Sequence, residues 1–383
     1  MVARVPYLGG KRATTRVRPY VMGSDFLGNN EYSKRLGKIS PSQFQAALDR
    51  FDLGTFLHAK PTLSGLFGQN VFVSSTKGEF VLRGNPHFPW QFPTEQFFVQ
   101  MLYERTSVPV PFPYHIDVST DIFGWSYVLM PRMKGIQIAD ADVKKQLSRE
   151  DRLGIARALG ENLAAIQELT WPFPGRYSPE THTIQPFELL HELAWPFPVE
   201  DMVFYTSVEP TIITFSEHIV AHIRHMLAGC CAMNDHTTAS DGVWVEKMLA
   251  LAEEALDVPF QPCVVMEDYK PANTVLEYTD GMWRVSGVFD LMEAHFGDGE
   301  ADLSRTVAMY LMEDPQLARE FVQAYFKGKP PRAGFAERFS IYMLHDRLII
   351  WEYLQRNAPE ALSRWHTFQE WAMPYASCLI GLE

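Results

Sequence analysis

Two short β-prone runs separated by Asp280-Gly281 constrain how this 383-residue chain can fold more than any other feature. Thr274 to Tyr278 and Met282 to Phe289 are rich in β-branched and aromatic residues, and Asp-Gly between such runs is a strong signal for a tight β-hairpin. Closing this hairpin brings Asn273, before its first strand, close to Asp290, after its second. Counted outward from the turn, the two are offset by two residues, about 7 Å, which a bulge or strand twist could reduce.

A polar loop lies directly before the hairpin. The apolar run Cys263 to Met266 is long enough for a buried strand and too short for a helix, and the loop from Glu267 to Asn273 follows it. Asp268 lies on this loop, five residues before Asn273, with its carboxylate free to accept a proton. One Mg²⁺ could contact both Asn273 and Asp290, because hard cations prefer oxygen ligands. A base and two metal ligands in this arrangement are what phosphoryl transfer from ATP requires.

At these residues the chain resembles the aminoglycoside phosphotransferase and choline kinase-like family, small-molecule relatives of the protein kinases. Asp268-x-x-x-x-Asn273 is similar to the kinase catalytic loop, and Asp290 is similar to the metal-binding Asp of the DFG position. Gly297-Asp298 and Asp302-Leu303 resemble the segment that follows in this family. The resemblance implies a two-lobed, protein-kinase-like α+β fold, with a small N-terminal antiparallel β lobe and a larger, mainly helical C-terminal lobe.

The resemblance also implies ATP and Mg²⁺ as cofactors and assigns roles to the loop and the hairpin. Asp268 would accept the proton of an acceptor hydroxyl, Lys270 would offset charge on the transferring group, and Asn273 and Asp290 would hold Mg²⁺. One departure is Met266-Glu267, where the family usually has His-Gly, which puts a second carboxylate beside the proposed base. That carboxylate could raise the pKa of the base or point into solvent.

The stretch from Lys60 to Arg83 indicates a strand, a glycine loop, a second strand, a tight turn and a third strand. Two glycines near a hairpin more often only make a turn, but the resemblance places backbone N–H groups of this loop near the ATP phosphates. Arg83 stands where kinases keep a lysine, and would hold phosphates while paired with Glu95, or otherwise with Glu104. The residues expected to bind nucleotide are Ser64, Gly65, Gly68, Asn70, Arg83, Glu95 and Met130.

Met130 marks the expected hinge between the lobes, where backbone groups would bind adenine. The sequence is accordingly divided into an N-terminal arm and helix at 1–57, a nucleotide-binding lobe at 58–131 and a helical lobe at 132–383. Apolar residues recur with helical spacing within Ser148 to Leu169, which predicts a helix with one buried face.

The acceptor pocket is expected to form from residues 175–256, since the family builds its substrate site there. His218 and His222 have one-turn spacing, but no third zinc ligand accompanies them, so a helix face is the simpler interpretation. Candidate contacts to a cationic or polyhydroxylated compound are Tyr205, Glu209, Glu217, Asp235 and Asp241, which the sequence does not rank.

Composition limits the partners. The chain has 34 basic and 46 acidic residues, a formal charge of −12. This charge argues against broad nucleic-acid binding and is compatible with a cationic acceptor, although ordinary solubility is the simpler explanation. No apolar run approaches 18 residues, so no membrane span is expected. Four cysteines without metal-ligand spacing favour a reducing cytoplasm.

The basic first 24 residues indicate an arm rather than a transit peptide. Nothing indicates an oligomeric state.

The sequence therefore predicts an ATP-dependent O-phosphotransferase acting on a hydroxyl of a small molecule, aminoglycoside-like or amino-alcohol-like. The alternative is a pseudokinase-like protein that binds nucleotide or ligand without catalysis, and it is motivated by Arg83 and Met266-Glu267. A protein kinase is disfavoured because no Ala-Pro-Glu segment follows closely after Asp290: Ala358-Pro359-Glu360 lies 68 positions downstream. The identity of the acceptor and the choice between ATP and GTP stay open.

Overall fold

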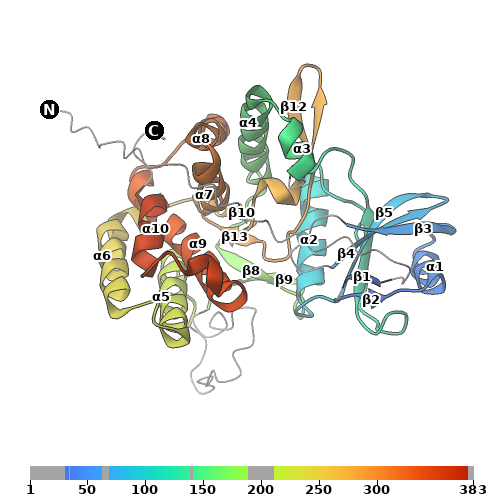
Figure 1. Ribbon diagram of the computed structural model, residues 1–383, viewed down its shortest axis with the longest axis horizontal. Coiled ribbons are helices and arrows are strands. Elements are labelled where there is room, and N and C mark those ends of the chain that lie inside the picture. The colour runs from blue at the N-terminus through green and yellow to red at the C-terminus, as the bar shows by residue number, and fades with distance from the viewer. Residues whose placement is uncertain (1–30, 34, 63–68, 139–140, 189–210, 378–383) are drawn as a thin grey trace.

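The chain folds into a small β-rich lobe and a larger helical lobe, as the sequence predicts (Figure 1). The computed structural model describes residues 31–33, 35–62, 69–138, 141–188 and 211–377, and the statements below concern these residues. Ser64, Gly65 and Gly68 of the expected glycine loop lie outside them, as do Tyr205 and Glu209.

The small lobe is built on a five-stranded antiparallel sheet. Its strands lie in the order β3 (Phe56–Pro61), β4 (Asn70–Ser75), β5 (Gly78–Gly84), β7 (Tyr127–Pro131) and β6 (His115–Asp117). The central strand β5 is hydrogen-bonded on both sides, to β4 and to β7. A side chain near the end of β5 is therefore held by strands on either side.

Two helices flank this sheet, and the first shares a core with it. Strands β1 (Glu31–Ser33) and β2 (Gly37–Lys38) lead into α1 (Pro41–Arg50), which buries Phe44 and Leu48 in one cluster with Val71 and Val73 of β4. The expected boundary at 57/58 falls inside β3, which begins at Phe56. Helix α2 (Gln91–Arg105) lies between the sheet and the large lobe (Figure 1).

Helices make up most of the large lobe. They are α3 (Ala141–Gln146), α4 (Arg149–Ile166), α5 (Phe215–Met233), α6 (Ala239–Leu256), α7 (Leu303–Glu313), α8 (Pro315–Gly328), α9 (Phe335–Asn357) and α10 (Phe368–Ala376), with the 3₁₀ turns η1 (Pro271–Asn273), η2 (Gly299–Asp302) and η3 (Pro359–Leu362). Helix α4 falls within the stretch predicted to be helical and packs closely on α8: a Cβ added to Gly160 would lie 2.2 Å from the carbonyl oxygen of Phe321.

Short strands between the helices carry the loops of the large lobe. One sheet has the order β10 (Cys263–Val265), β13 (His295–Gly297), β8 (Gly175–Ser178) and β9 (Thr183–Pro186). The hairpin of β11 (Thr274–Thr279) and β12 (Met282–Val288) forms a separate pair beside α4 (Figure 1). The loop between β10 and β11 and the end of β12 are therefore fixed by different sheets.

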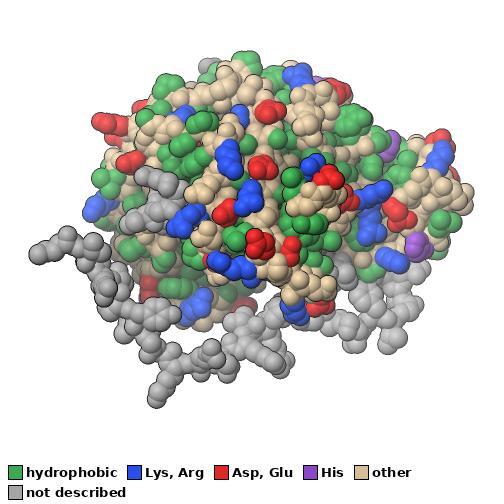
Figure 2. All heavy atoms as spheres, turned by 90° about the horizontal axis from the view of Figure 1, so that it is seen from above, with side chains coloured by type: hydrophobic (Ala, Val, Ile, Leu, Met, Phe, Trp, Pro, Cys, Tyr) green, Lys and Arg blue, Asp and Glu red, His purple; other side chains and the backbone are tan. Residues whose placement is uncertain are grey.

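Acidic and basic side chains are intermixed on the face above α4 and α8 (Figure 2). Ion pairs such as Arg157–Glu320 and Arg152–Glu313 join α4 to the helices beside it. This face carries no large patch of one charge sign. Among the described helices, none combines the length and the apolar character that crossing a lipid bilayer would require.

Candidate active site

The hairpin has the tight turn that the sequence predicts, and a bulge adjusts its register. Asp280 and Gly281 both adopt positive φ angles, 54° and 79°, as a two-residue hairpin turn requires. The register shifts by one residue between Val275 and Leu276, and beyond it the N–H of Phe289 donates to the carbonyl of Asn273 at 3.1 Å. The bulge therefore brings Asp290 one residue closer to Asn273 than an unbroken ladder would.

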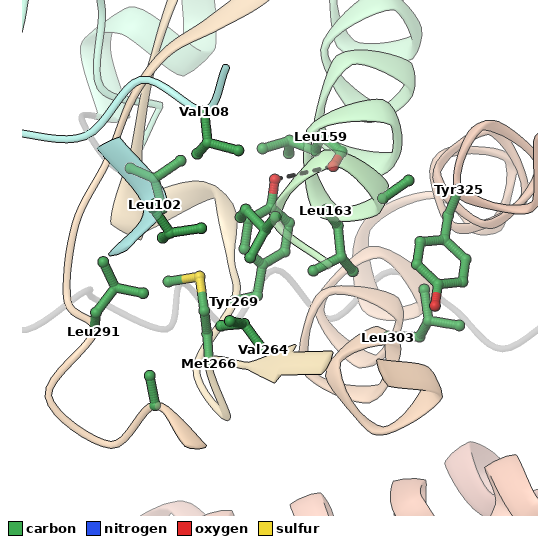
Figure 3. Packing of buried hydrophobic residues seen from close by; sticks show 14 of the residues in the cluster. Leu102, Val108, Leu159, Leu163, Val264, Met266, Tyr269, Leu291, Leu303 and Tyr325 are labelled. Atoms are coloured by element: carbon green, nitrogen blue, oxygen red, sulfur yellow. Dashed lines mark hydrogen bonds between the residues drawn. The ribbon is translucent and has the colours of Figure 1, made fainter. Parts of the chain in front are cut away.

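Side chains on both sides of Asp268 fasten the loop to the core. Met266 and Tyr269 point into the apolar cluster between the lobes, near Leu102 and Leu159 (Figure 3). The Tyr269 hydroxyl donates to the carbonyl of Leu159 at 2.9 Å. Anchors at two positions leave the polar residues between them little freedom to move.

Asp302 braces the backbone of the same loop. Its two carboxylate oxygens accept hydrogen bonds from the N–H groups of Met266, at 2.6 Å, and Glu267, at 2.8 Å. Burial raises the pKa of Asp302 to about 7, although these two N–H donors favour the ionised form. The sequence identified Asp302 only through its resemblance to the family's downstream segment.

Asp268 has two oxygens in different surroundings. Its Oδ2 accepts from the ammonium of Lys270 and, at 3.2 Å, from the side-chain amide of Asn273. Its Oδ1 is buried without a hydrogen-bond partner among the described residues, and the guanidinium of Arg305 lies 3.6 Å away. One carboxylate oxygen is thus held by neighbours on the loop, and the other is buried beside Arg305.

Arg305 belongs to a chain of charges that the sequence did not predict. Its Nε lies 2.5 Å from Oδ1 of Asp346 on α9, and Arg347 contacts the other oxygen of that carboxylate. Burial alone would raise the pKa of Asp346, but Arg305 and Arg347 hold it below its ordinary value. Asp346 therefore stays ionised and keeps Arg305 beside Asp268.

The predicted pair of Arg83 and Glu95 is present and reaches further than expected. Nη1 of Arg83 donates to both carboxylate oxygens of Glu95, at 3.1 and 3.0 Å, and Nη2 donates to Oδ1 of Asp290 at 2.6 Å. Tyr114 donates to Glu95 at 2.6 Å. Burial alone would lower the pKa of Arg83, but the two carboxylates raise it. Glu104, the alternative partner, is exposed and accepts from Gln100 instead.

Asn273 and Asp290 lie side by side. Burial opposes ionisation of Asp290, but Arg83 and a hydrogen bond from the Asn273 side chain lower the pKa of this carboxyl. Asp290 has a φ of 75°, a conformation that residues with a Cβ seldom adopt. An amide oxygen and a carboxylate are donors that suit Mg²⁺, whose shell is commonly completed by phosphates and water. No three His, Cys, Asp or Glu residues in the described parts of the chain form another metal-binding group.

The remaining predicted nucleotide-binding residues lie in the sheet of the small lobe. Asn70 pairs with Arg83 across β4 and β5, and its side-chain oxygen is buried without a hydrogen-bond partner among the described residues. Met130 is buried in β7, opposite Val81. The structure thus brings Asp268, Lys270, Asn273, Asp290, Arg83 and Glu95 together, and puts Asn70 beside Arg83.

Two of the candidate contacts in the expected acceptor region, Glu217 and Asp241, have structural roles. Glu217 forms the capping box of α5 with Thr214, and Asp241 accepts from the backbone of Thr238 and Gln369. Nδ1 of His222 and Nε2 of His345 share a hydrogen bond of 2.7 Å, and the ring of His218 stacks on Phe187. Glu217, Asp241, His218 and His222 do not line the pocket beside the loop, whose lining residues come mainly from α9, α5 and η2.

The model of the phosphotransferase enzyme family (APH) matches residues 58–199 and 228–335, more than half of the chain. The chain belongs to this family. No curated protein sequence matches it significantly. Both matched segments contain candidate site residues of this phosphotransferase family member: the first contains Arg83 and Glu95, and the second the loop with Asp268 and the hairpin.

Solved structures share the fold of this phosphotransferase family member. A thermostable mutant of aminoglycoside phosphotransferase APH(4)-Ia, in a ternary complex with ADP and hygromycin B, superimposes with a TM-score of 0.57 and 16% identity over 88% of this chain and 97% of that one. A putative fructosamine-3-kinase from Haemophilus somnus superimposes with a TM-score of 0.53 and 15% sequence identity, over 87% of this chain and 95% of that one. The choline kinase LicA from Streptococcus pneumoniae superimposes with a TM-score of 0.51 and 11% sequence identity, over 88% of this chain and 98% of that one.

Proposed function

We propose that this chain is an ATP-dependent O-phosphotransferase that phosphorylates a hydroxyl group of a small molecule. One observation carries the proposal: Asp268, Asn273 and Asp290 come together beside Arg83, which extends from the small lobe. Membership of the phosphotransferase enzyme family supports the reaction type. A structural relative complexed with ADP and hygromycin B, and another that is a choline kinase, support a small-molecule acceptor.

Asp268 orients the acceptor hydroxyl and accepts its proton. Oδ2 is held by Lys270 and Asn273, while Oδ1 lacks a hydrogen-bond partner among the described residues. An acceptor hydroxyl that donates to this carboxylate would lose its proton to it as its oxygen bonds to the transferring phosphorus, and proton transfer to a positioned carboxylate accelerates such steps by about 10²–10⁴-fold. Lys270, in contact with the same carboxylate, offsets charge on the group being transferred.

Arg83 binds the nucleotide phosphates, and Glu95 holds Arg83 in position. Arginine binds phosphate bidentately and never loses its charge, so it can replace the lysine of relatives at this position. Backbone groups near Met130 bind adenine, and the nucleotide is further enclosed by Ser64, Gly65, Gly68 and Asn70. The lobe of residues 58–131 accordingly holds the nucleotide, residues 132–383 hold the catalytic hairpin and the acceptor, and 1–57 supply an arm and a helix.

Asn273 and Asp290 would hold Mg²⁺. When bound, Mg²⁺ neutralises charge on the β- and γ-phosphates during transfer. The amide of Asn273 also donates to the backbone oxygen of Asp268 at 2.9 Å, so one residue fixes both the proposed base and the metal site. The acidic composition is consistent with a hydroxyl acceptor that carries positive charge, and with neither nucleic acid nor a membrane as a partner. Four cysteines without metal-ligand spacing are consistent with a cytoplasmic location.

The test is turnover of ATP and GTP with Mg²⁺ against a panel of hydroxyl compounds, for wild type and Asp268→Asn. The matched control is Asp280→Asn, which makes the same change at the tip of the hairpin, where Asn-Gly favours the same turn. We expect Asp268→Asn to lower kcat by about 100-fold or more while Asp280→Asn leaves it unchanged. Equal turnover by wild type and Asp268→Asn would remove Asp268 from its role.

A second candidate function is nucleotide binding without catalysis. The hydrogen bond from Arg83 to Asp290 favours it, because this bond puts a cation on the proposed metal ligand. Calorimetric titration with ATP in the presence and absence of Mg²⁺ distinguishes the two functions. Equal affinity in both conditions, with no turnover on any acceptor, would favour the binding protein over the phosphotransferase.

A further inference from the structure

The buried carboxylate of Glu95 has a partner that the proposed function does not use. Tyr114, the residue directly before β6, donates from its hydroxyl to Oε2 of Glu95 at 2.6 Å. Both residues are buried. A hydrogen bond to a carboxylate is charge-assisted and about twice as strong as a bond between neutral groups. Removing this hydroxyl should therefore be felt wherever Glu95 acts.

Donors from three parts of the chain converge on Glu95. Its Oε1 accepts from Nη1 of Arg83 and from the N–H groups of Asp290 and Leu291. Its Oε2 accepts from Nη1 of Arg83, at 3.0 Å, and from Tyr114. Without the hydroxyl, Oε2 would depend on Arg83 alone. The proposed function assigns that same guanidinium to the nucleotide phosphates, so Tyr114 is the donor to Oε2 that has no second task.

Tyr114 can act only as a donor in this bond. Burial, together with the carboxylate of Glu95, raises the pKa of Tyr114, and the nearby Arg83 opposes that rise only in part. The phenol therefore keeps its proton near neutral pH. A neutral hydroxyl beside a carboxylate has one arrangement available, in which the O–H points at the carboxylate oxygen. This bond consequently fixes the orientation of the Glu95 carboxylate.

The segment that carries Tyr114 is itself held at both ends. Residues 108–113 include three prolines, and proline restricts the backbone by fixing φ. The carbonyl of Pro109 accepts from the N–H of Val288, the last residue of β12, at 2.8 Å. The carbonyl of Tyr114 accepts from the side chain of Gln96 on α2 at 3.1 Å. The hydroxyl is thus placed relative to the hairpin and to helix α2 together.

We propose that Tyr114 is a positioning residue: its hydroxyl holds Glu95 so that Arg83 meets the nucleotide phosphates and Asp290 keeps its place as a ligand for Mg²⁺. The proposal rests on the proposed phosphotransferase function and adds a residue to it. Tyr114 acts through Glu95 rather than on a substrate. Loss of the hydroxyl should let the carboxylate turn toward Arg83 and away from the N–H groups that follow the hairpin.

The experiment measures calorimetric binding of ATP and GTP, with and without Mg²⁺, to wild type and to Tyr114→Phe, which removes only the hydroxyl. The matched control is Tyr342→Phe. Tyr342, on α9, also donates to a buried carboxylate at 2.6 Å, that of Asp298, which is paired with Arg332 rather than with a residue of the site. Both variants therefore lose a bond of the same kind and length. Denaturant midpoints are measured alongside, with KM and kcat for any acceptor that is phosphorylated.

Both variants should unfold at similarly lowered denaturant concentrations, because each leaves one buried carboxylate without a donor. Only Tyr114→Phe should weaken binding of the preferred nucleotide with Mg²⁺, by about tenfold, as the loss of one charge-assisted hydrogen bond implies. The loss should be smaller without Mg²⁺, since Asp290 then contributes less. The acceptor KM should not change, because the loop with Asp268 is braced separately. A merely structural role predicts lowered midpoints with unchanged nucleotide affinity in both variants.

A double-mutant cycle tests whether Tyr114 acts through Glu95. Glu95→Gln keeps the shape of the side chain and removes its charge. Added to this variant, Tyr114→Phe should cost about threefold or less in nucleotide affinity, because two residues that share one interaction are not additive. The full tenfold loss in the Glu95→Gln background would mean that Tyr114 acts by another route, and would overturn the proposal.

Binding and turnover keep the two proposals apart. Absence of phosphoryl transfer to every acceptor overturns the proposed function, and the role of Tyr114 in nucleotide binding is then decided by calorimetry alone. A nucleotide affinity of Tyr114→Phe equal to that of wild type overturns this role, as do equal losses in Tyr114→Phe and Tyr342→Phe. Failure of wild type to bind either nucleotide overturns both proposals.

Discussion

Arg83 and Asp290, separated by 207 positions in the chain, are joined by a hydrogen bond of 2.6 Å that connects the two lobes. The same guanidinium binds Glu95, which is completely buried. Glu95 also accepts from the N–H groups of Asp290 and Leu291, at 3.0 and 3.1 Å. One buried ion pair thus fixes the position of the segment that follows the hairpin.

Replacing Arg83 should therefore reduce stability as well as nucleotide binding. Arg83→Met leaves Glu95 buried without its cation, and we expect the free energy of unfolding to fall by about 3 kcal/mol in urea titrations. Arg83→Lys keeps a charge but cannot bind both oxygens at once, so its loss should be smaller. The control is Arg157→Gln at the exposed pair with Glu320, where the change should stay below about 1 kcal/mol. Equal losses in Arg83→Met and the control would contradict this account.

Close packing of α4 on α8 gives a second prediction. A Cβ at position 160 would lie 2.2 Å from the Phe321 carbonyl oxygen, so Gly160→Ala should destabilise the fold by about 3 kcal/mol. Gly229 in α5 has no atom within 4 Å of such a Cβ, and Gly229→Ala should stabilise by about 0.5–1 kcal/mol because alanine favours the helix. Urea midpoints of both variants check this. Similar midpoints would mean that the two helices can separate at little cost.

The features that were predicted correctly from the sequence are those that depend on a few neighbouring residues or on a family motif. Asp280-Gly281 determines its own turn because both residues accept positive φ angles, and the turn then fixes which residues meet. The pairing of Arg83 with Glu95 followed from the family resemblance. The bulge near Val275 was foreseen only as a possibility, because a one-residue shift in register has no distinct composition.

The pocket and its charges could not be predicted in the same way. Asp346 and Arg347 lie on α9, in a stretch where the sequence pattern indicated mostly core residues. Their meeting with Arg305 depends on how α9 docks against α5 and α7, and helix docking is set by the whole core rather than by neighbours in sequence. Glu217 and Asp241 were candidates by charge alone, but capping uses their carboxylates.

Stability should depend on pH through Glu293. Burial, with the nearby Glu267 carboxylate, raises the pKa of Glu293 to about 7 from its ordinary 4.5. Above pH 4.5 the unfolded chain loses this proton more readily than the folded protein, so the contribution of Glu293 to stability falls as pH rises to about 7 and is constant above it. Glutamine mimics the protonated group. Glu293→Gln should match wild type near pH 4.5 and exceed its unfolding free energy by about 3 kcal/mol at pH 8.

Urea titrations at half-unit pH intervals from 4.5 to 8 measure this difference. Using the difference between the two proteins removes the contributions of all other titrating groups that the substitution does not alter. A difference that is flat across this range, or that shrinks as pH rises, would show that Glu293 is ionised in the folded protein throughout.

Arg305 is expected to position Asp268 without taking part in proton transfer. Its guanidinium lies 3.6 Å from Asp268 Oδ1 and is held by Asp346, so its removal should let the carboxylate rotate away from the acceptor. We expect Arg305→Gln to lower kcat by about 100-fold, since misplacement by about 1 Å can cost that much, while the nucleotide KM is unchanged. Arg305→Lys should recover part of the rate, because a shorter cation can still contact one of the two carboxylates. Steady-state kinetics with saturating acceptor separates the two constants, and a loss confined to the nucleotide KM would instead place Arg305 at the phosphates.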